Sequence, residues 1–91
     1  MDENNVLDFK PRARGMVIGD IPWLARISDK ARAKQADRIG DYIYPCPADQ
    51  RFLQEVQMSA EAFTELVASC VDDDEVIEKM KAHLASLKEN P

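Results

Sequence analysis

The stretch that decides the fold is DIPWLARISDKARAK, residues 20–34, which predicts the first helix of the chain. Apolar and small residues recur there at three- and four-residue spacing, the pattern of a helix that buries one face. Asp20 is expected to be the N-cap, and Pro22 fits the first turn, where its missing N–H leaves no hydrogen bond unmade. We therefore expect a helix over about residues 21–37, with Gly40 in its exit turn. The buried face is expected to contain Leu24, Ala25, Ile27, Ser28 and Ala31.

Three further helices are predicted downstream, each with a capping residue and an apolar face. They span about residues 47–56, 60–70 and 74–88. Pro47 suits the first turn of the first of them, and Ser59 is a good N-cap for the second, because its hydroxyl oxygen can accept a free N–H. Asp72 or Asp73 is expected to cap the last one, and the spacing of Asp72 and Glu75 matches a capping box.

The segments outside these helices are predicted to be irregular or extended. Residues 41–46 are expected to be extended, because β-favouring residues fill them and the residue before a proline avoids the helical region. Residues 1–19 are expected to form an irregular N-terminal arm. The predicted fold class is therefore all-α: a small single domain of about four helices at residues 20–89, with one extended connector.

Length and charge exclude several classes of protein. Ninety-one residues make one domain, which can bury a modest core without disulfides or metal ions. The net charge is −5, but residues 1–40 carry eight Lys and Arg against six Asp and Glu, whereas residues 41–91 carry four against eleven. The acidic half argues against general nucleic-acid binding, and the basic half leaves room for a small anion site.

Localisation and cofactors follow from equally simple observations. No apolar run is long enough to cross a membrane, and the acidic N-terminus MDENNVLDFKP lacks the apolar region of a signal peptide. We therefore expect a cytoplasmic protein with reduced cysteines. One His and two separated Cys do not make a zinc site, and the acidic residues 72–75 lack the pattern of a calcium loop. The sequence predicts no metal and no cofactor.

Cys46 is the candidate catalytic residue, because it is expected at the N-terminus of the helix that Pro47 opens. Oriented backbone N–H groups stabilise a thiolate at such a place. Against this, free cysteines usually behave as small buried hydrophobes, and His83, the only histidine, lies on a different predicted helix. Cys46 is therefore either a reactive thiol or a packing residue.

The charge cluster RISDKARAK, residues 26–34, also has two interpretations. It is either a solvated helix face with pairs at i, i+3 and i, i+4, or an anion site, because Arg binds oxyanions through two parallel hydrogen bonds. Tyr42 and Tyr44 are expected on one face of the extended segment, as core anchors or as a binding platform. Asp49 either complements the helix dipole or pairs with a cation of the cluster. The candidate ligand-binding residues are Arg12, Arg26, Asp29, Lys30, Arg32, Tyr42, Tyr44 and Asp49.

Three segments together resemble a family of small bacterial proteins known as the domain of unknown function DUF5069. The segments are KPRARG (10–15), DIPWLARISDKARAK (20–34) and GDYIYPCPADQRFL (40–53), and the resemblance covers about residues 8–82. The residues that match the family pattern are Arg26, Asp29, Lys30, Arg32, Gly40, Tyr42, Tyr44, Cys46, Pro47, Asp49 and Phe52. The chain departs from it with Ala31, where many relatives have Gly, and with Ala13, where Ser-Pro is common.

The resemblance implies no particular activity, but it implies that these polar residues are a family signature. It favours a site between the first helix and residues 40–50, in which cations of the helix pair with Asp29 and Asp49 and the tyrosine hydroxyls join. The same residues also fit a structural polar cluster that locks the connector to the helix, because buried charges must be paired.

Three functions fit these observations. The first, which the residues favour, is a binding or interaction module without enzymatic activity, which takes a small anion or a protein partner at the basic face of the first helix. The second is a thiol-dependent enzyme or redox protein that uses Cys46 as its nucleophile. The third is a structural homodimer, with Trp23 and the apolar stripes at its interface.

Overall fold

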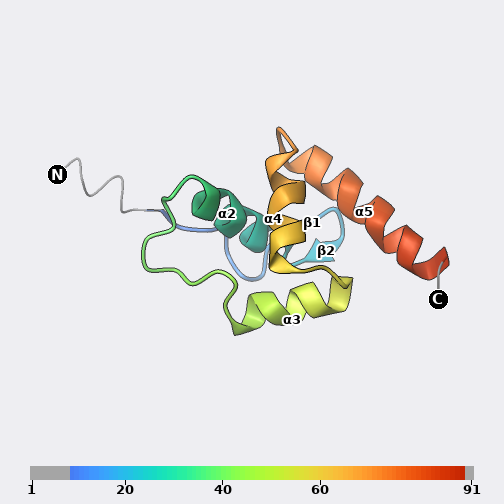
Figure 1. Cartoon of the computed structure of the whole chain (residues 1–91), viewed down its shortest axis with the longest axis horizontal. Coiled ribbons are helices and arrows are strands. Elements are labelled where there is room, and N and C mark those ends of the chain that lie inside the picture. The colour runs from blue at the N-terminus through green and yellow to red at the C-terminus, as the bar shows by residue number, and fades with distance from the viewer. Residues whose placement is uncertain (1–8, 90–91) are drawn as a thin grey trace.

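The computed structural model describes residues 9–89, and this part of the chain contains four helices and a two-stranded hairpin (Figure 1). The strands are β1 (Val17–Ile18) and β2 (Ile21–Pro22), and the helices are α2 (Leu24–Gln35), α3 (Pro47–Val56), α4 (Ala60–Ala68) and α5 (Asp73–Glu89). The predicted class, a small helical domain, is confirmed. Residues 1–8 of the expected arm lie outside the described residues.

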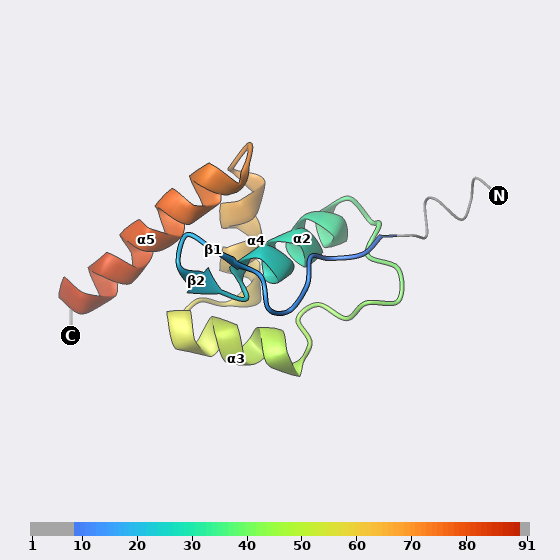
Figure 2. The same cartoon turned by 180° about the vertical axis from the view of Figure 1, so that it is seen from behind.

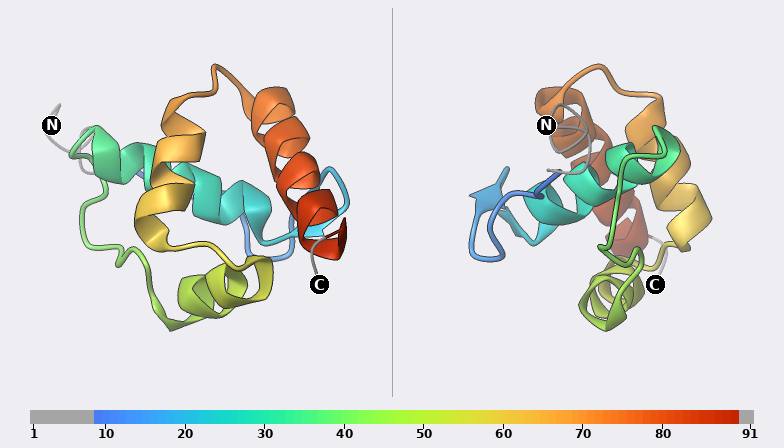
Figure 3. Two further views of the ribbon diagram at one scale, coloured as in Figure 1. Left: turned by 45° about the vertical axis from the view of Figure 1, so that its right-hand side comes forward. Right: turned by 90° about the vertical axis from the view of Figure 1, so that its left-hand side faces the viewer.

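Helix α2 is the central element of the fold. It packs against α4, which crosses it (Figures 1 and 3), and α4 also contacts α3 and α5. Seen from behind, the hairpin lies between α2 and α5 (Figure 2). The core lies where these elements meet, and its fully buried apolar side chains include Leu24, Ile27, Phe63, Val67, Val76 and Met80.

The start of α2 differs from the expectation. The sequence placed Asp20 at the N-cap and Pro22 in the first turn, and both assignments are wrong, because Trp23 is the N-cap. Gly19 and Asp20 have φ angles of 58° and 62°, as a type I′ hairpin turn requires. The residues around this turn therefore pair as β1 and β2, and the helix begins only after the hairpin ends.

The other helix starts agree with the caps expected from the sequence. Ser59 Oγ accepts from the backbone N–H of Ala62 at 3.0 Å, and Asp72 Oδ1 accepts from that of Glu75 at 3.0 Å. The predicted inner face of α2 is also buried throughout. Residues 41–46 form a connector with turns and without a paired strand, and it carries the chain from the end of α2 to the start of α3.

Candidate functional site

The first polar cluster consists of Trp23, Lys30, Cys46 and Asp49, and we call it the buried network. Lys30 Nζ donates to Asp49 Oδ2 at 2.6 Å, and the two side chains are only 3% and 0% exposed. Trp23 Nε1 donates to Asp49 Oδ1 at 2.8 Å, and the backbone N–H of Cys46 donates to Asp49 Oδ2 at 3.0 Å. Because a buried carboxylate needs a counter-charge and donors, these contacts explain how Asp49 lies inside the protein.

Cys46 is the N-cap of α3, as the sequence predicted. Its Sγ accepts from the backbone N–H of Asp49 at 3.5 Å and from Lys30 Nζ at 3.4 Å. Burial alone raises the pKa of Asp49, but hydrogen bonds from Lys30, Trp23 and the Cys46 backbone outweigh burial and hold that pKa below its usual value. At neutral pH the buried network therefore carries an ionised carboxylate beside the thiol.

The second polar cluster consists of Arg12, Asp29, Arg32 and Asp73, and we call it the surface network. Arg12 donates through Nε and Nη2 to the two Asp29 oxygens, at 2.9 Å each. It also donates to the Asp73 oxygens, at 2.6 Å from Nη1 and 3.1 Å from Nη2. Arg32 Nη1 adds a third link to Asp73 at 3.2 Å. The surface network thereby ties the segment before the hairpin to α2 and to the first residue of α5.

Charges in the surface network stabilise one another. The hydrogen bond from Arg12 is the main reason that the pKa of Asp73 is lowered, and the hydrogen bond from Arg32 lowers it further. Burial of the carboxylate raises this pKa, but by less than the hydrogen bonds lower it. Hydrogen bonds to Asp73 and Asp29 in turn raise the pKa of Arg12. The four side chains are 18% to 36% exposed, so water reaches this network much more readily than the buried one.

Arg26 and the aromatic side chains form a third group next to the surface network. Arg26 Nη1 donates to the backbone oxygen of Arg12 at 3.1 Å. Its guanidinium carbon lies 5.9 Å from the ring centroids of both Trp23 and Tyr42, a distance at which cation–π attraction operates. Phe9 meets Tyr42 edge to face, with the ring centroids 5.6 Å apart. Arg26 therefore joins the N-terminal segment to the connector.

Tyr44 contacts a different element from Tyr42, so the two tyrosines do not share one face as expected. Its hydroxyl lies 2.7 Å from Thr64 Oγ1 on α4. Burial raises the pKa of Tyr44, and the hydrogen bond with Thr64 partly offsets that rise. The expectation of a shared face assumed a regular strand, and the connector instead turns at residues 40–41 and 44–45.

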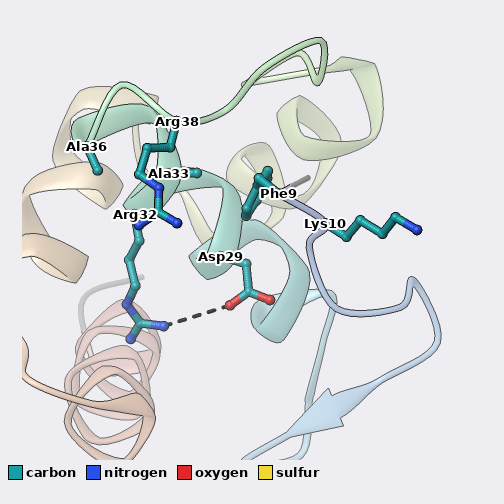
Figure 4. A pocket seen from close by; sticks show the side chains of 7 residues that line it. All are labelled: Phe9, Lys10, Asp29, Arg32, Ala33, Ala36 and Arg38. Carbon is teal, nitrogen blue, oxygen red and sulfur yellow. Dashed lines mark ion pairs between the residues drawn. The ribbon is translucent and has the colours of Figure 1, made fainter. Parts of the chain in front are cut away.

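A groove of about 440 Å³ runs beside α2 (Figure 4). Its lining residues are Phe9, Lys10, Asp29, Arg32, Ala33, Ala36 and Arg38. Within residues 9–89, the side chains of Lys10 and Arg38 make no hydrogen bond or ion pair. Arg32 Nη2 is buried and has no hydrogen-bond partner in the same part of the chain. The charge of Asp29, in contrast, is compensated by Arg12.

The predicted site residues thus divide into separate groups. Lys30, Cys46 and Asp49 belong to the buried network, while Arg12, Asp29 and Arg32 belong to the surface network. The sequence interpretation missed Phe9, Lys10 and Arg38 of the groove, and it assigned Asp73 only a capping role. Their residue types were visible, but no spacing rule connects residue 10 with residue 38, since only the tertiary fold places both beside one groove.

His83 does not approach Cys46. Its Nε2 lies 2.7 Å from the backbone oxygen of Val56, at the C-terminal end of α3, whereas Cys46 caps the N-terminal end. Ten helical residues separate these ends by about 15 Å. A thiol–imidazole pair is therefore not part of this structure.

In the part of the chain that the structure describes, no three His, Cys, Asp or Glu side chains are grouped so that they could hold a metal ion. None of the helices described is both long and apolar enough to span a membrane.

Comparison with known proteins identifies the family. No curated protein matches the chain. The model of a domain of unknown function, DUF5069, matches residues 9–90. The match extends over nearly the whole chain and includes the buried network, the surface network and the groove. The chain therefore belongs to the DUF5069 family.

Proposed function

We propose that this domain is a binding module that takes a small anionic ligand in the groove beside α2. The observation that carries the proposal is a set of three cationic side chains, Lys10, Arg32 and Arg38, around one groove with an apolar wall. Its volume of about 440 Å³ lies within the range of roughly 300–1,000 Å³ that small-molecule sites have.

The charges around the groove support an anion rather than a cation. The one acid in the lining, Asp29, already accepts three hydrogen bonds from Arg12, so its charge is offset. Lys10 and Arg38 are exposed and have no carboxylate partner in the described residues. An anion beside the Arg38 guanidinium gains charge-assisted hydrogen bonds without displacing any bond of that side chain.

An unpaired donor atom of Arg32 also supports an anion site in the groove. A buried N–H group without an acceptor costs free energy, and Arg32 Nη2 is such a group within residues 9–89. Nη2 is shielded from solvent in the folded domain, so a ligand oxygen removes this cost only where the covering side chains move aside. Binding would then use a donor that the folded domain leaves unused.

The test measures thermal stability against the concentration of inorganic phosphate, with ionic strength held constant by sodium chloride, because simple salt screens surface charges. A ligand that binds only the folded state raises its stability with saturation. Arg38→Ala is expected to weaken phosphate binding about tenfold, the loss of one charge-assisted hydrogen bond.

The matched control is Arg51→Ala. Arg51 is an exposed residue of α3 that lines a different groove, and its removal changes the net charge by the same amount. We expect it to leave phosphate binding unchanged. Equal effects of Arg38→Ala and Arg51→Ala, or no saturable stabilisation of the unsubstituted protein, would contradict the proposal.

A second candidate function, thiol chemistry at Cys46, is favoured by one specific observation. The Cys46 sulfur accepts from a helix N-terminal N–H and lies 3.4 Å from the Lys30 ammonium, so a donor and a cation both lie beside the sulfur. The test is alkylation of Cys46 by iodoacetamide in a Cys70→Ser background. Faster reaction than in the unfolded chain supports this function, whereas reaction only on unfolding makes Cys46 a packing residue.

A further inference from the structure

We propose that the buried network holds a modification site, at which Cys46 and Lys30 become joined by a sulfur–nitrogen bond when a hydroperoxide oxidises the thiol. The product is a sulfenamide, which links the first turn of α3 covalently to the middle of α2. The inference rests on the second candidate function, thiol chemistry at Cys46, and it does not depend on the anion site.

The two reacting atoms already lie close enough to react. Lys30 Nζ is 3.4 Å from Cys46 Sγ, within the range of about 3–3.5 Å that reacting atoms occupy just before a bond forms. The residues are 16 positions apart, so the tertiary fold holds this contact. Lys30 is only 3% exposed and is bonded to Asp49 at 2.6 Å, so its nitrogen has little freedom to turn towards water.

The sulfur is accessible to a small oxidant, and its neighbours are nitrogen atoms. Cys46 is only partly buried, so a hydroperoxide can reach it. A sulfenic acid condenses with a thiol or with a nitrogen. Both cysteines of the chain are free, whereas Lys30 Nζ and the backbone nitrogen of Asp49 both contact Cys46 Sγ. The structure therefore supplies nitrogen, and the lysine amine is the better nucleophile of the two.

The reaction takes place in two balanced steps. In the first, the thiol attacks one oxygen of the hydroperoxide: an S–O bond forms, the O–O bond breaks, and the peroxide leaves as an alcohol or as water. Cys46 is thereby oxidised by two electrons to a sulfenic acid. In the second step the lone pair of the Lys30 amine attacks that sulfur. An S–N bond forms, the S–O bond breaks, and the hydroxyl leaves with one amine proton as water.

Asp49 takes up the remaining proton. An ammonium has no lone pair, so Lys30 must release one proton before it attacks, and Asp49 Oδ2 lies 2.6 Å from its nitrogen. Burial raises the pKa of Asp49, and the hydrogen bond from Lys30 is the largest effect that lowers it. Loss of the lysine charge therefore favours the neutral acid. Two opposite charges become two neutral groups, so the cross-link leaves no unpaired charge inside the protein.

The test treats the full chain, in a Cys70→Ser background, with hydrogen peroxide and measures the masses of its tryptic peptides. We expect one peptide pair that joins Lys30 to Cys46. Its mass should be about 2 Da below the sum of the two reduced peptides, because one oxygen is gained and one water is lost. Dithiothreitol should release the two peptides again. Measuring peptides keeps this signal apart from the oxygen that methionines take up.

Two lysine variants identify the partner of the sulfur. In Lys30→Met the amine is absent, so the linked pair should disappear and Cys46 should gain oxygen instead. Lys34→Met is the matched control, because Lys34 is an exposed lysine of the same helix, and the yield of the linked pair should stay unchanged. If the Cys46 peptide of Lys30→Met still becomes lighter by about 2 Da, the backbone nitrogen of Asp49 is the partner and the inference is wrong.

The chain that retains Lys30 decides the inference even if Lys30→Met does not fold. A Cys46 peptide that gains about 16 or 32 Da, one or two oxygen atoms, without any linked pair means that the thiol reacts but does not join Lys30. In that case thiol chemistry at Cys46 stands and the cross-link is refuted. If Cys46 of the folded chain does not react with peroxide at all, both are refuted together.

Discussion

The buried network and the surface network use the same kinds of ion pair, but they differ in their access to water. Lys30 and Asp49 are 3% and 0% exposed, whereas Arg12 and Asp73 are 30% and 33% exposed. Removing one partner of a buried pair leaves an uncompensated charge inside the protein, while water replaces the lost partner at a surface. We therefore expect the loss of one partner to destabilise the fold much more in the buried network than in the surface network.

The largest expected effect is that of Asp49→Ala, which tests the buried side of the comparison. It strands the Lys30 ammonium, frees the Trp23 N–H and removes half of the α3 capping box. We expect a loss of about 3–5 kcal/mol in the free energy of unfolding, out of a total that is roughly 5–15 kcal/mol for such domains. Denaturant unfolding monitored by helix content measures the loss.

Lys30→Met sharpens that result, because it removes the cation but leaves two donors, Trp23 Nε1 and the Cys46 N–H, on the carboxylate. The loss in the free energy of unfolding should therefore be smaller for Lys30→Met than for Asp49→Ala. A loss below about 1 kcal/mol for Asp49→Ala, the range of a surface pair, would show that the buried network does not differ from the surface network.

A smaller effect is expected for Asp73→Asn in the surface network, and it should depend on pH. Because the folded-state pKa of Asp73 lies below the ordinary aspartate value of 3.8, its contribution to stability is present above that value. It is lost as the pH falls through the lower, folded-state pKa. At pH 7 the variant should lose about 1 kcal/mol, and its melting temperature should fall less steeply below pH 4 than that of the unsubstituted protein.

Asp74→Asn is the control, since Asp74 is the next residue of α5 and is exposed. It makes the same change in net charge without removing a bond to Arg12. If the melting temperatures of Asp73→Asn and of the unsubstituted protein fall equally steeply below pH 4, the prediction is contradicted. Residual acid sensitivity is expected in both, because the pKa of Asp49 is lowered as well.

The smallest effect is expected for Cys46→Ser. Serine is among the best N-cap residues, so it can replace the sulfur that accepts from the Asp49 N–H, and the change should stay within about 0.5 kcal/mol of the original stability. Cys46→Ala removes the cap and should cost about 1 kcal/mol. Thermal melts of both variants give the comparison, and a Ser variant as unstable as the Ala variant would contradict it.

The elements that were predicted correctly are those that local residues determine. Cys46 and Pro47, Ser59 and Asp72 each begin a helix through contacts within four residues, so their sequence is sufficient. The start of α2 was predicted wrongly because the two-residue turn Gly19-Asp20 was not recognised, although Gly-Asp between β-favouring residues is a local hairpin signal. The bond from the Trp23 indole to Asp49 spans 26 residues, and no local pattern contains that contact.

The candidate sites show the same limit. Pairing of Lys30 with Asp49 was among the expected arrangements, since both belong to the family signature that the sequence revealed. The groove was not expected, because it assembles Lys10 with residues near the end of α2 only when Arg12 holds the N-terminal segment in place. The residue types alone show which side chains are charged. Only the tertiary fold shows which of the cations are paired with a carboxylate and which are not.

The bond between Arg12 and Asp73 also bears on the kinetics of folding. These residues are 61 positions apart, so their contact closes a loop over most of the chain, and we expect it to form after α2 and α4 have packed, because closing a long loop costs entropy. Contacts that form after the transition state change the unfolding rate far more than the folding rate. The surface network is therefore expected to determine how long a folded molecule survives, and to have little influence on how quickly it forms.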